Sequence, residues 1–61
     1  MRDYIVIMQT SSLDYYNIGK NAWCKDASFA KTFTKRGAEK ETEKYNNYNF
    51  DANIQFTYRE I

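Results

Sequence analysis

Histidine and proline are absent from this 61-residue sequence, cysteine occurs once and glycine only twice. Without His, the commonest general base and metal ligand is missing, and one Cys cannot form an internal disulfide. Gly19 and Gly37 lie too far apart to build a phosphate-binding glycine loop. Cys24 has no sequence neighbour that could act as its base. We therefore expect no catalytic residue, no metal site, no cofactor and no enzyme activity.

Long apolar runs are missing as well. The longest is the five residues from Tyr4 to Met8, whereas a signal peptide needs about 7–15 and a membrane helix about 20. A lone cysteine fits a reducing compartment. We expect one domain over residues 1–61, located in the cytoplasm, with no membrane partner. The net charge of +1 gives no overall preference for nucleic acid.

Aromatic residues are abundant, with six Tyr, four Phe and one Trp. A domain of this size is usually stable by roughly 3–5 kcal/mol, and here neither a disulfide nor a metal supports it. Each aromatic side chain can bury about 150–250 Å², which makes these residues the expected core. Binding to a partner or self-association would add further stability.

Three segments have the composition and alternation of β-strands. Residues 3–10 are apolar on both faces, which is typical of a central strand. Residues 13–18 follow a short polar break, so we expect a hairpin with this second strand at the edge of the sheet. Residues 52–60 alternate strictly, with one apolar face made by Ala52, Ile54, Phe56 and Tyr58.

Between these strands lie an irregular segment and one helix. In residues 22–33, Asp26 is a suitable N-cap for a single helical turn. We expect four side chains of this segment to point inward: Trp23, Phe29, Ala30 and Phe33. The helix is expected to begin at the capping residue Thr34 and to end at Asn46 and Asn47 in a left-handed conformation. Its expected inward line is Ala38, Thr42 (or the stem of Glu41) and Tyr45.

The elements together predict an α+β fold of order β-β-α-β. The last strand would run antiparallel beside the first, which gives a three-stranded antiparallel sheet of order 2-1-3. The helix would cover one face of this sheet and leave the other face bare. An exposed sheet face or sheet edge can serve for homodimerisation, which is one of the functions that we consider.

Two features indicate a binding surface. Lys35 and Arg36 lie in the first helical turn, where acidic residues are normally favoured, so they would suit an anionic group on a partner. They are equally compatible with solvated cations offset by Glu39. Tyrosine is common at protein interfaces, although these tyrosines would also suit a small core. The expected contact residues are Tyr15, Tyr16, Lys35, Arg36 and Tyr48.

The spacing of Trp23, Ala30, Phe33 and Ala38 after a YIVI strand resembles small open reading frames of bacteriophages and prophages. The resemblance covers about residues 4–45 and concerns packing residues only. It implies a compact protein that binds and blocks or modulates a host protein, such as a polymerase, defence or transcription factor. No catalytic or binding residue is transferred from it. A protein-binding module with a host-protein partner is therefore the leading hypothesis.

Nucleic-acid binding is the main alternative. Residues 20–44 hold seven Lys or Arg and four Asp or Glu, a net charge of +3. Tyrosines on a sheet beside such a segment could stack on bases. Binding that falls steeply with salt would indicate this alternative, whereas an aromatic protein interface would change little.

Overall fold

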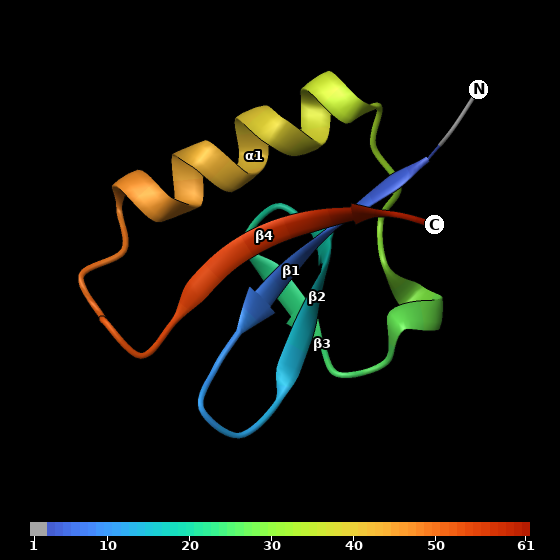
Figure 1. The fold of residues 1–61 in the computed structure, drawn as a ribbon. Coiled ribbons are helices and arrows are strands. Elements are labelled where there is room, and N and C mark those ends of the chain that lie inside the picture. The colour runs from blue at the N-terminus through green and yellow to red at the C-terminus, as the bar shows by residue number, and fades with distance from the viewer. Residues whose placement is uncertain (1–2) are drawn as a thin grey trace.

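The computed structural model describes residues 3–61 and contains one helix and a four-stranded antiparallel sheet (Figure 1). The strand order is β3-β2-β1-β4. The elements are β1 (Tyr4–Gln9), β2 (Asp14–Gly19), β3 (Ala22–Cys24), the short 3₁₀ turn η1 (Ala27–Phe29), α1 (Lys35–Asn47) and β4 (Gln55–Glu60). The predicted α+β class with a single helix is confirmed.

Strand β1 lies between β2 and β4, as its sequence predicts. It pairs with both neighbours in antiparallel register, with Ile7 opposite Tyr16 and Thr57. Consecutive strand residues point to opposite faces of a sheet. Ile5, Val6 and Ile7 are nevertheless all buried, at 4%, 0% and 5% exposure. The apolar character of both faces of this segment therefore reflects burial on both faces.

The prediction of three strands is wrong, because residues 22–24 form the additional strand β3. Lys20 and Asn21 turn the chain back on β2, and Asn21 adopts the left-handed conformation with φ 55°. An Asn tolerates this conformation in tight turns. Strand β2 is consequently an inner strand and not the edge strand that the sequence predicted. Strand β3 was not predicted because its three residues are too few to show the alternation typical of a strand.

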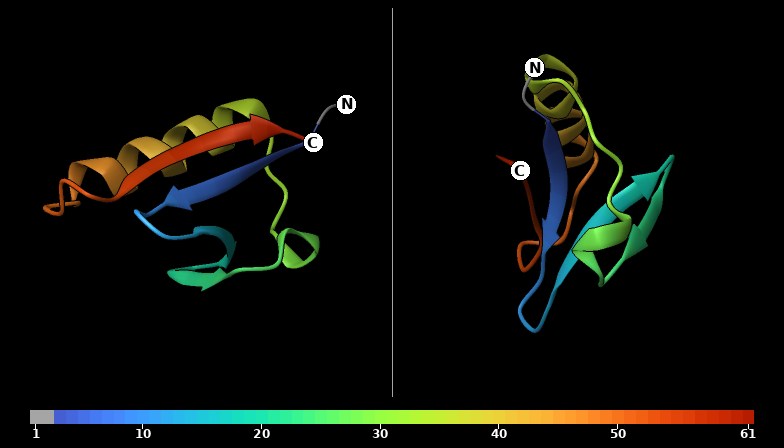
Figure 2. Two further views of the ribbon diagram at one scale, coloured as in Figure 1. Left: turned by 60° about the horizontal axis from the view of Figure 1, so that its bottom comes forward. Right: turned by 90° about the vertical axis from the view of Figure 1, so that its right-hand side faces the viewer.

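The sheet divides partway along β2. Strand β2 pairs with β1 only from Asp14 to Tyr16, and the β2–β3 hairpin then bends away (Figure 2). The segment after η1, residues 31–33, lies between β1 and β2 where the two strands separate. Phe33 exchanges two backbone hydrogen bonds of 2.8 Å with Tyr4, and the Lys31 N–H donates to the Asn17 carbonyl at 2.8 Å. This segment therefore takes the place of β2 beside the beginning of β1.

Helix α1 covers one face of the sheet. The Thr34 hydroxyl caps it by accepting a hydrogen bond from the Gly37 N–H at 3.1 Å, as predicted. The predicted inward residues are also confirmed, because Ala38 and Thr42 are buried and Tyr45 packs on the sheet. Tyr45, Trp23 and Phe56 form an aromatic cluster with ring centroids 5.2–5.4 Å apart.

Three local predictions are wrong. Phe29 points outward and is 67% exposed, because the three-residue turn η1 has no buried residue. The last strand begins at Gln55, since the side chains of Asn49 and Asp51 hold residues 49–54 in turns. Helix α1 ends without a left-handed residue, because Asn21 is the one non-glycine residue with positive φ in the described part of the chain.

Candidate functional site

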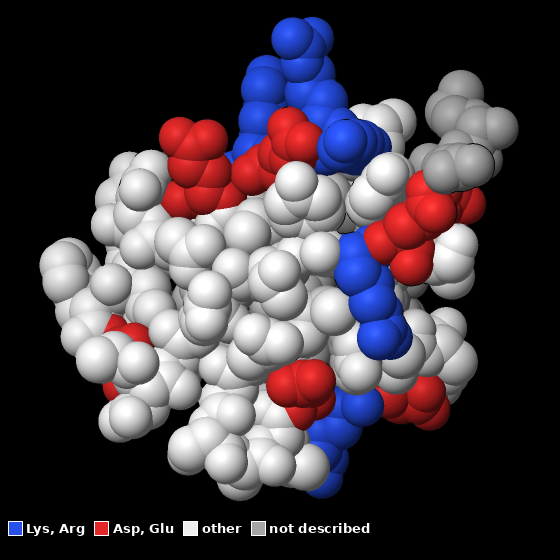
Figure 3. Space-filling model, in the orientation of Figure 1, with Lys and Arg blue, Asp and Glu red and all other residues white. Residues whose placement is uncertain are grey.

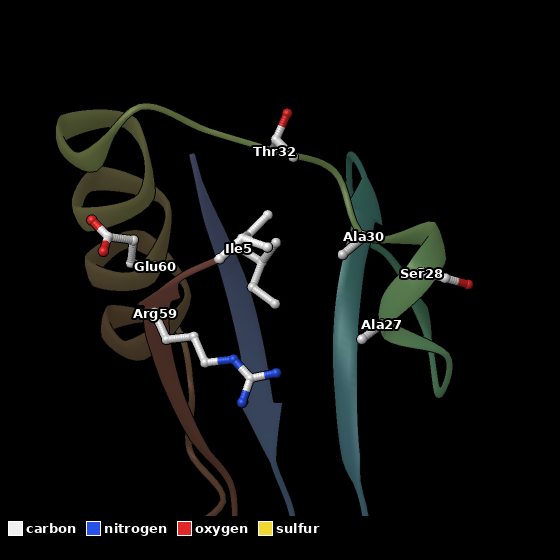
Figure 4. A pocket seen from close by; sticks show the side chains of 8 residues that line it. Ile5, Ala27, Ser28, Ala30, Thr32, Arg59 and Glu60 are labelled. Atoms are coloured by element: carbon white, nitrogen blue, oxygen red, sulfur yellow. The ribbon is translucent and has the colours of Figure 1, made fainter. Parts of the chain in front are cut away.

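The face of the sheet opposite α1 is hollowed beside η1. A groove of about 580 Å³ lies there, with Ile5 of β1 in its floor. Its lining also includes Ala27, Ala30, Thr32, Arg59 and Ile61. Figure 4 shows Ala27 and Ala30 facing the groove from the η1 side, where their small side chains leave room. We call this hollow the sheet groove.

Arg59 is the charged side chain that Figure 4 shows directed across the floor of the sheet groove. It is exposed, and it lies opposite Ile5 in the β1–β4 register. The next residue, Glu60, also lines the groove, but Figure 4 shows its carboxylate turned away from the floor, and this carboxylate accepts a hydrogen bond from the Tyr4 hydroxyl at 3.4 Å. An acidic group in the groove would therefore meet a guanidinium above an apolar floor.

The η1 wall of the groove is fixed by a side-chain cap. The Asp26 carboxylate accepts hydrogen bonds from the Ser28 N–H at 2.9 Å and the Ser28 hydroxyl at 2.7 Å. These bonds lower the pKa of Asp26 below its ordinary value of 3.8. The predicted capping role of Asp26 is thus confirmed, and it holds Ala27 at the groove.

Two large exposed apolar side chains belong to the chain segments that line the sheet groove. Phe29 follows the lining residue Ser28, and Ile61 lines the groove itself while remaining 71% exposed. Exposed apolar side chains are common singly, but a group beside a cavity often marks an interaction site. The groove therefore continues into an apolar surface that a partner could cover.

A second cleft, of about 300 Å³, lies on the α1 side of the sheet at the division described above. Its lining comprises Asn17, Gly19, Lys20, Lys31, Glu41 and Lys44. Three lysines from three separate elements therefore converge on one cleft. We call it the lysine cleft, and it shares no lining residue with the sheet groove.

Two aromatic residues are exposed in the loop after α1. Tyr48 is 75% and Phe50 96% exposed, and Tyr48 is also the C-cap of α1. Figure 3 shows charged side chains gathered along α1, while much of the surface over β4 and this loop is uncharged. The exposed aromatics are thus at the opposite end of α1 from Lys35 and Arg36.

The open edge of β4 is partly covered by the side chain of Asn46. Its amide nitrogen donates to the Phe56 carbonyl at 3.0 Å, and its amide oxygen accepts from the Phe56 N–H at 3.0 Å. The amide thus occupies the backbone groups that another strand would use. Homodimerisation through this edge would have to displace Asn46.

The five predicted contact residues do not form one surface. Tyr15 lies opposite Met8 on the α1 side, whereas Tyr16 lies opposite Ile7 on the groove side. Lys35 and Arg36 begin α1 and Tyr48 follows its end, about 20 Å away along 13 helical residues. None of the five lines either hollow.

Sequence reasoning missed Arg59 and the small residues of the groove wall. The alternation of the last strand places Arg59 on the face opposite Phe56 and Tyr58, but nothing in the sequence shows that η1 lies across from it. The sequence indicated the lysine cleft only in part, since its lysines belong to the basic segment of residues 20–44. Only the fold selects Lys20, Lys31 and Lys44 from that segment.

Within residues 3–61, no three His, Cys, Asp or Glu side chains are grouped as a metal site would require. No helix in the same range is long and apolar enough to cross a membrane. Comparison with known proteins gave no matching family model, no matching curated protein and no matching solved structure. The resemblance to phage open reading frames remains a prediction.

Proposed function

We propose that this protein is a non-enzymatic protein-binding module that holds a short segment of its partner in the sheet groove. The bound segment would place an apolar side chain over Ile5 and a carboxylate beside Arg59. The phage resemblance leads us to propose a host protein as the partner, which the module would block or modulate by covering this segment.

The observation that carries the proposal is a hollow with the apolar Ile5 in its floor and the guanidinium of Arg59 directed across it. The hollow of about 580 Å³ falls within the size range of ligand pockets, and it is large enough for more than one side chain. Ala27 and Ala30 provide no bulk that would fill it. A guanidinium binds a carboxylate with two parallel hydrogen bonds, which favours Asp, Glu or a terminal carboxylate.

The exposed apolar side chains of the segments that line the groove support the same conclusion. Ile61 offers exposed apolar area in the hollow, and the exposed Phe29 belongs to the chain segment that lines it. Aromatic and arginine residues are frequent at the energetic centres of interfaces. Arg59 lines the groove and matches that pattern.

The test is a binding measurement with short fluorescent peptides that combine one large apolar residue with a neighbouring Glu. We expect saturable binding that Arg59→Gln weakens about tenfold, because one charge-assisted contact is lost. Ala27→Trp should abolish binding by filling the hollow. The matched control is Arg36→Gln, which removes an exposed cation from α1, away from the groove.

A second peptide series distinguishes specific recognition of the peptide carboxylate from nonspecific binding. When Glu in the peptide is replaced by Gln, the wild type and Arg59→Gln should bind it equally. Equal weakening by Arg36→Gln, or full binding by Ala27→Trp, would contradict the proposal. A folded circular dichroism spectrum of each variant excludes unfolding as the cause.

A further inference from the structure

The lysine cleft is a second candidate site, independent of the sheet groove and on the other face of the sheet. Its lining residues come from three parts of the chain, and one of these is the β2–β3 hairpin beyond the residues that pair with β1. Lys20 lies in the hairpin turn, Lys31 in the segment after η1, and Lys44 in the last turns of α1. Their convergence is therefore a product of the fold.

The charge balance of the lysine cleft favours an anion. Three lysines and one acidic residue, Glu41, line it. Among the described residues, these lysines form no ion pair with the Glu41 carboxylate. The Lys31 ammonium lies 5.2 Å from the Phe33 ring centroid and the Lys44 ammonium 5.5 Å from that of Tyr45. The rings attract these cations but leave their charge unneutralised.

The floor of the cleft is polar and hydrogen-bonded. Asn17 is only 1% exposed, and its carbonyl accepts the Lys31 N–H at 2.8 Å. Its side-chain amide donates to the Tyr45 hydroxyl at 3.4 Å. These bonds join the Lys31 backbone and α1 to the hairpin, so the cleft is formed without a ligand.

We propose that the lysine cleft binds a small phosphorylated molecule, with its phosphate oxygens held by Lys20, Lys31 and Lys44. A compact ammonium suits phosphate, and three of them suit a group that carries about two negative charges. The volume of about 300 Å³ is at the lower end for ligand sites, which favours a small molecule. A strand of nucleic acid would require contacts with cations outside the cleft.

The test is an NMR titration of ¹⁵N-labelled protein with inorganic pyrophosphate and, separately, with ADP. We expect saturable shifts of the amide signals of Gly19, Lys20 and Lys31. Lys31→Gln and Lys44→Gln should each weaken binding about tenfold, because each removes a charge-assisted contact. Lys35→Gln and Lys40→Gln are the matched controls on α1, and they should bind like the wild type.

Glu41→Gln gives a sharper test, because it removes the one carboxylate of the cleft. We expect it to tighten pyrophosphate binding severalfold, an effect that an unfolded variant could not produce. Unsaturated shifts, or equal losses in the Lys35 and Lys40 controls, would overturn the proposal. A single-stranded oligonucleotide that binds more tightly with length, and depends on Lys35 and Lys40, would replace it with nucleic-acid binding.

Discussion

The two faces of the sheet are covered in different ways. On the α1 side, the helix lies on the aromatic cluster, and Val6 and Ala38 have no exposed area. On the groove side, a three-residue turn and its flanking chain cover Ile5 and Ile7 but leave a hollow beside them. Close packing stabilises the first face, whereas the second face combines a buried floor with accessible surface. Stability and binding are thus expected to depend on different residues.

The largest expected loss of stability comes from removing an aromatic side chain on the α1 side, and the same change on the groove side should cost much less. Trp23→Ala removes the ring that contacts both Tyr45 and Phe56. We expect a loss of about 3 kcal/mol, close to the whole stability of a domain this small. Phe29→Ala on the groove side should cost less than about 0.5 kcal/mol, because that ring is exposed. Chemical denaturation followed by circular dichroism measures both, and equal losses would contradict the comparison.

Asn46→Ala tests how α1 protects the edge of β4. Both hydrogen bonds to Phe56 are lost, and we expect a loss of about 1–2 kcal/mol. The freed backbone groups should also allow pairing between molecules, so sedimentation should detect concentration-dependent association. Asn47→Ala is the control, since Asn47 is exposed at the end of the same helix. A monomeric Asn46→Ala with unchanged stability would show that the amide does not protect the edge.

Thr42→Val tests the contribution of a buried hydroxyl, that of Thr42, on the α1 side of the sheet. The Thr42 hydroxyl is buried without a hydrogen-bond partner among the described residues. Valine has nearly the same shape, so we expect the variant to be more stable by about 1 kcal/mol. Thermal unfolding compared with Thr42→Ala, which also removes the methyl group, measures the difference. A loss of stability in Thr42→Val would show that the hydroxyl has a partner.

Asp26→Ala gives the smallest expected effect and concerns the groove side. Hydrogen bonds from Ser28 lower the pKa of Asp26 in the folded protein below 3.8. A carboxyl with a lowered folded pKa stabilises the fold above its unfolded pKa and loses this contribution as the pH falls. The acid-induced loss of stability below about pH 4 should therefore be smaller in Asp26→Ala. Identical pH profiles of stability in both proteins would contradict the capping role.

Helix α1 and strand β1 could be predicted from local patterns. Thr34 as the cap, Ala38, Thr42 and Tyr45 on one line, and five consecutive apolar residues in β1 are each visible in the sequence. Strand β3 could not be predicted in this way, since three residues carry too little alternation. The candidate sites were even less predictable. The sheet groove depends on η1 lying across β1 from Arg59, which no local pattern records.

The sequence by itself determined the α+β class, the central position of β1 and the limits and inward face of α1. These properties follow from short-range periodicity and capping, which act over a few residues. Tertiary structure decided the fourth strand, the division of the sheet, the outward position of Phe29 and the two hollows. These depend on contacts between distant segments, such as Tyr4 with Phe33 and Asn17 with Lys31. Such contacts form only when the whole chain packs, so local residue preferences do not encode them.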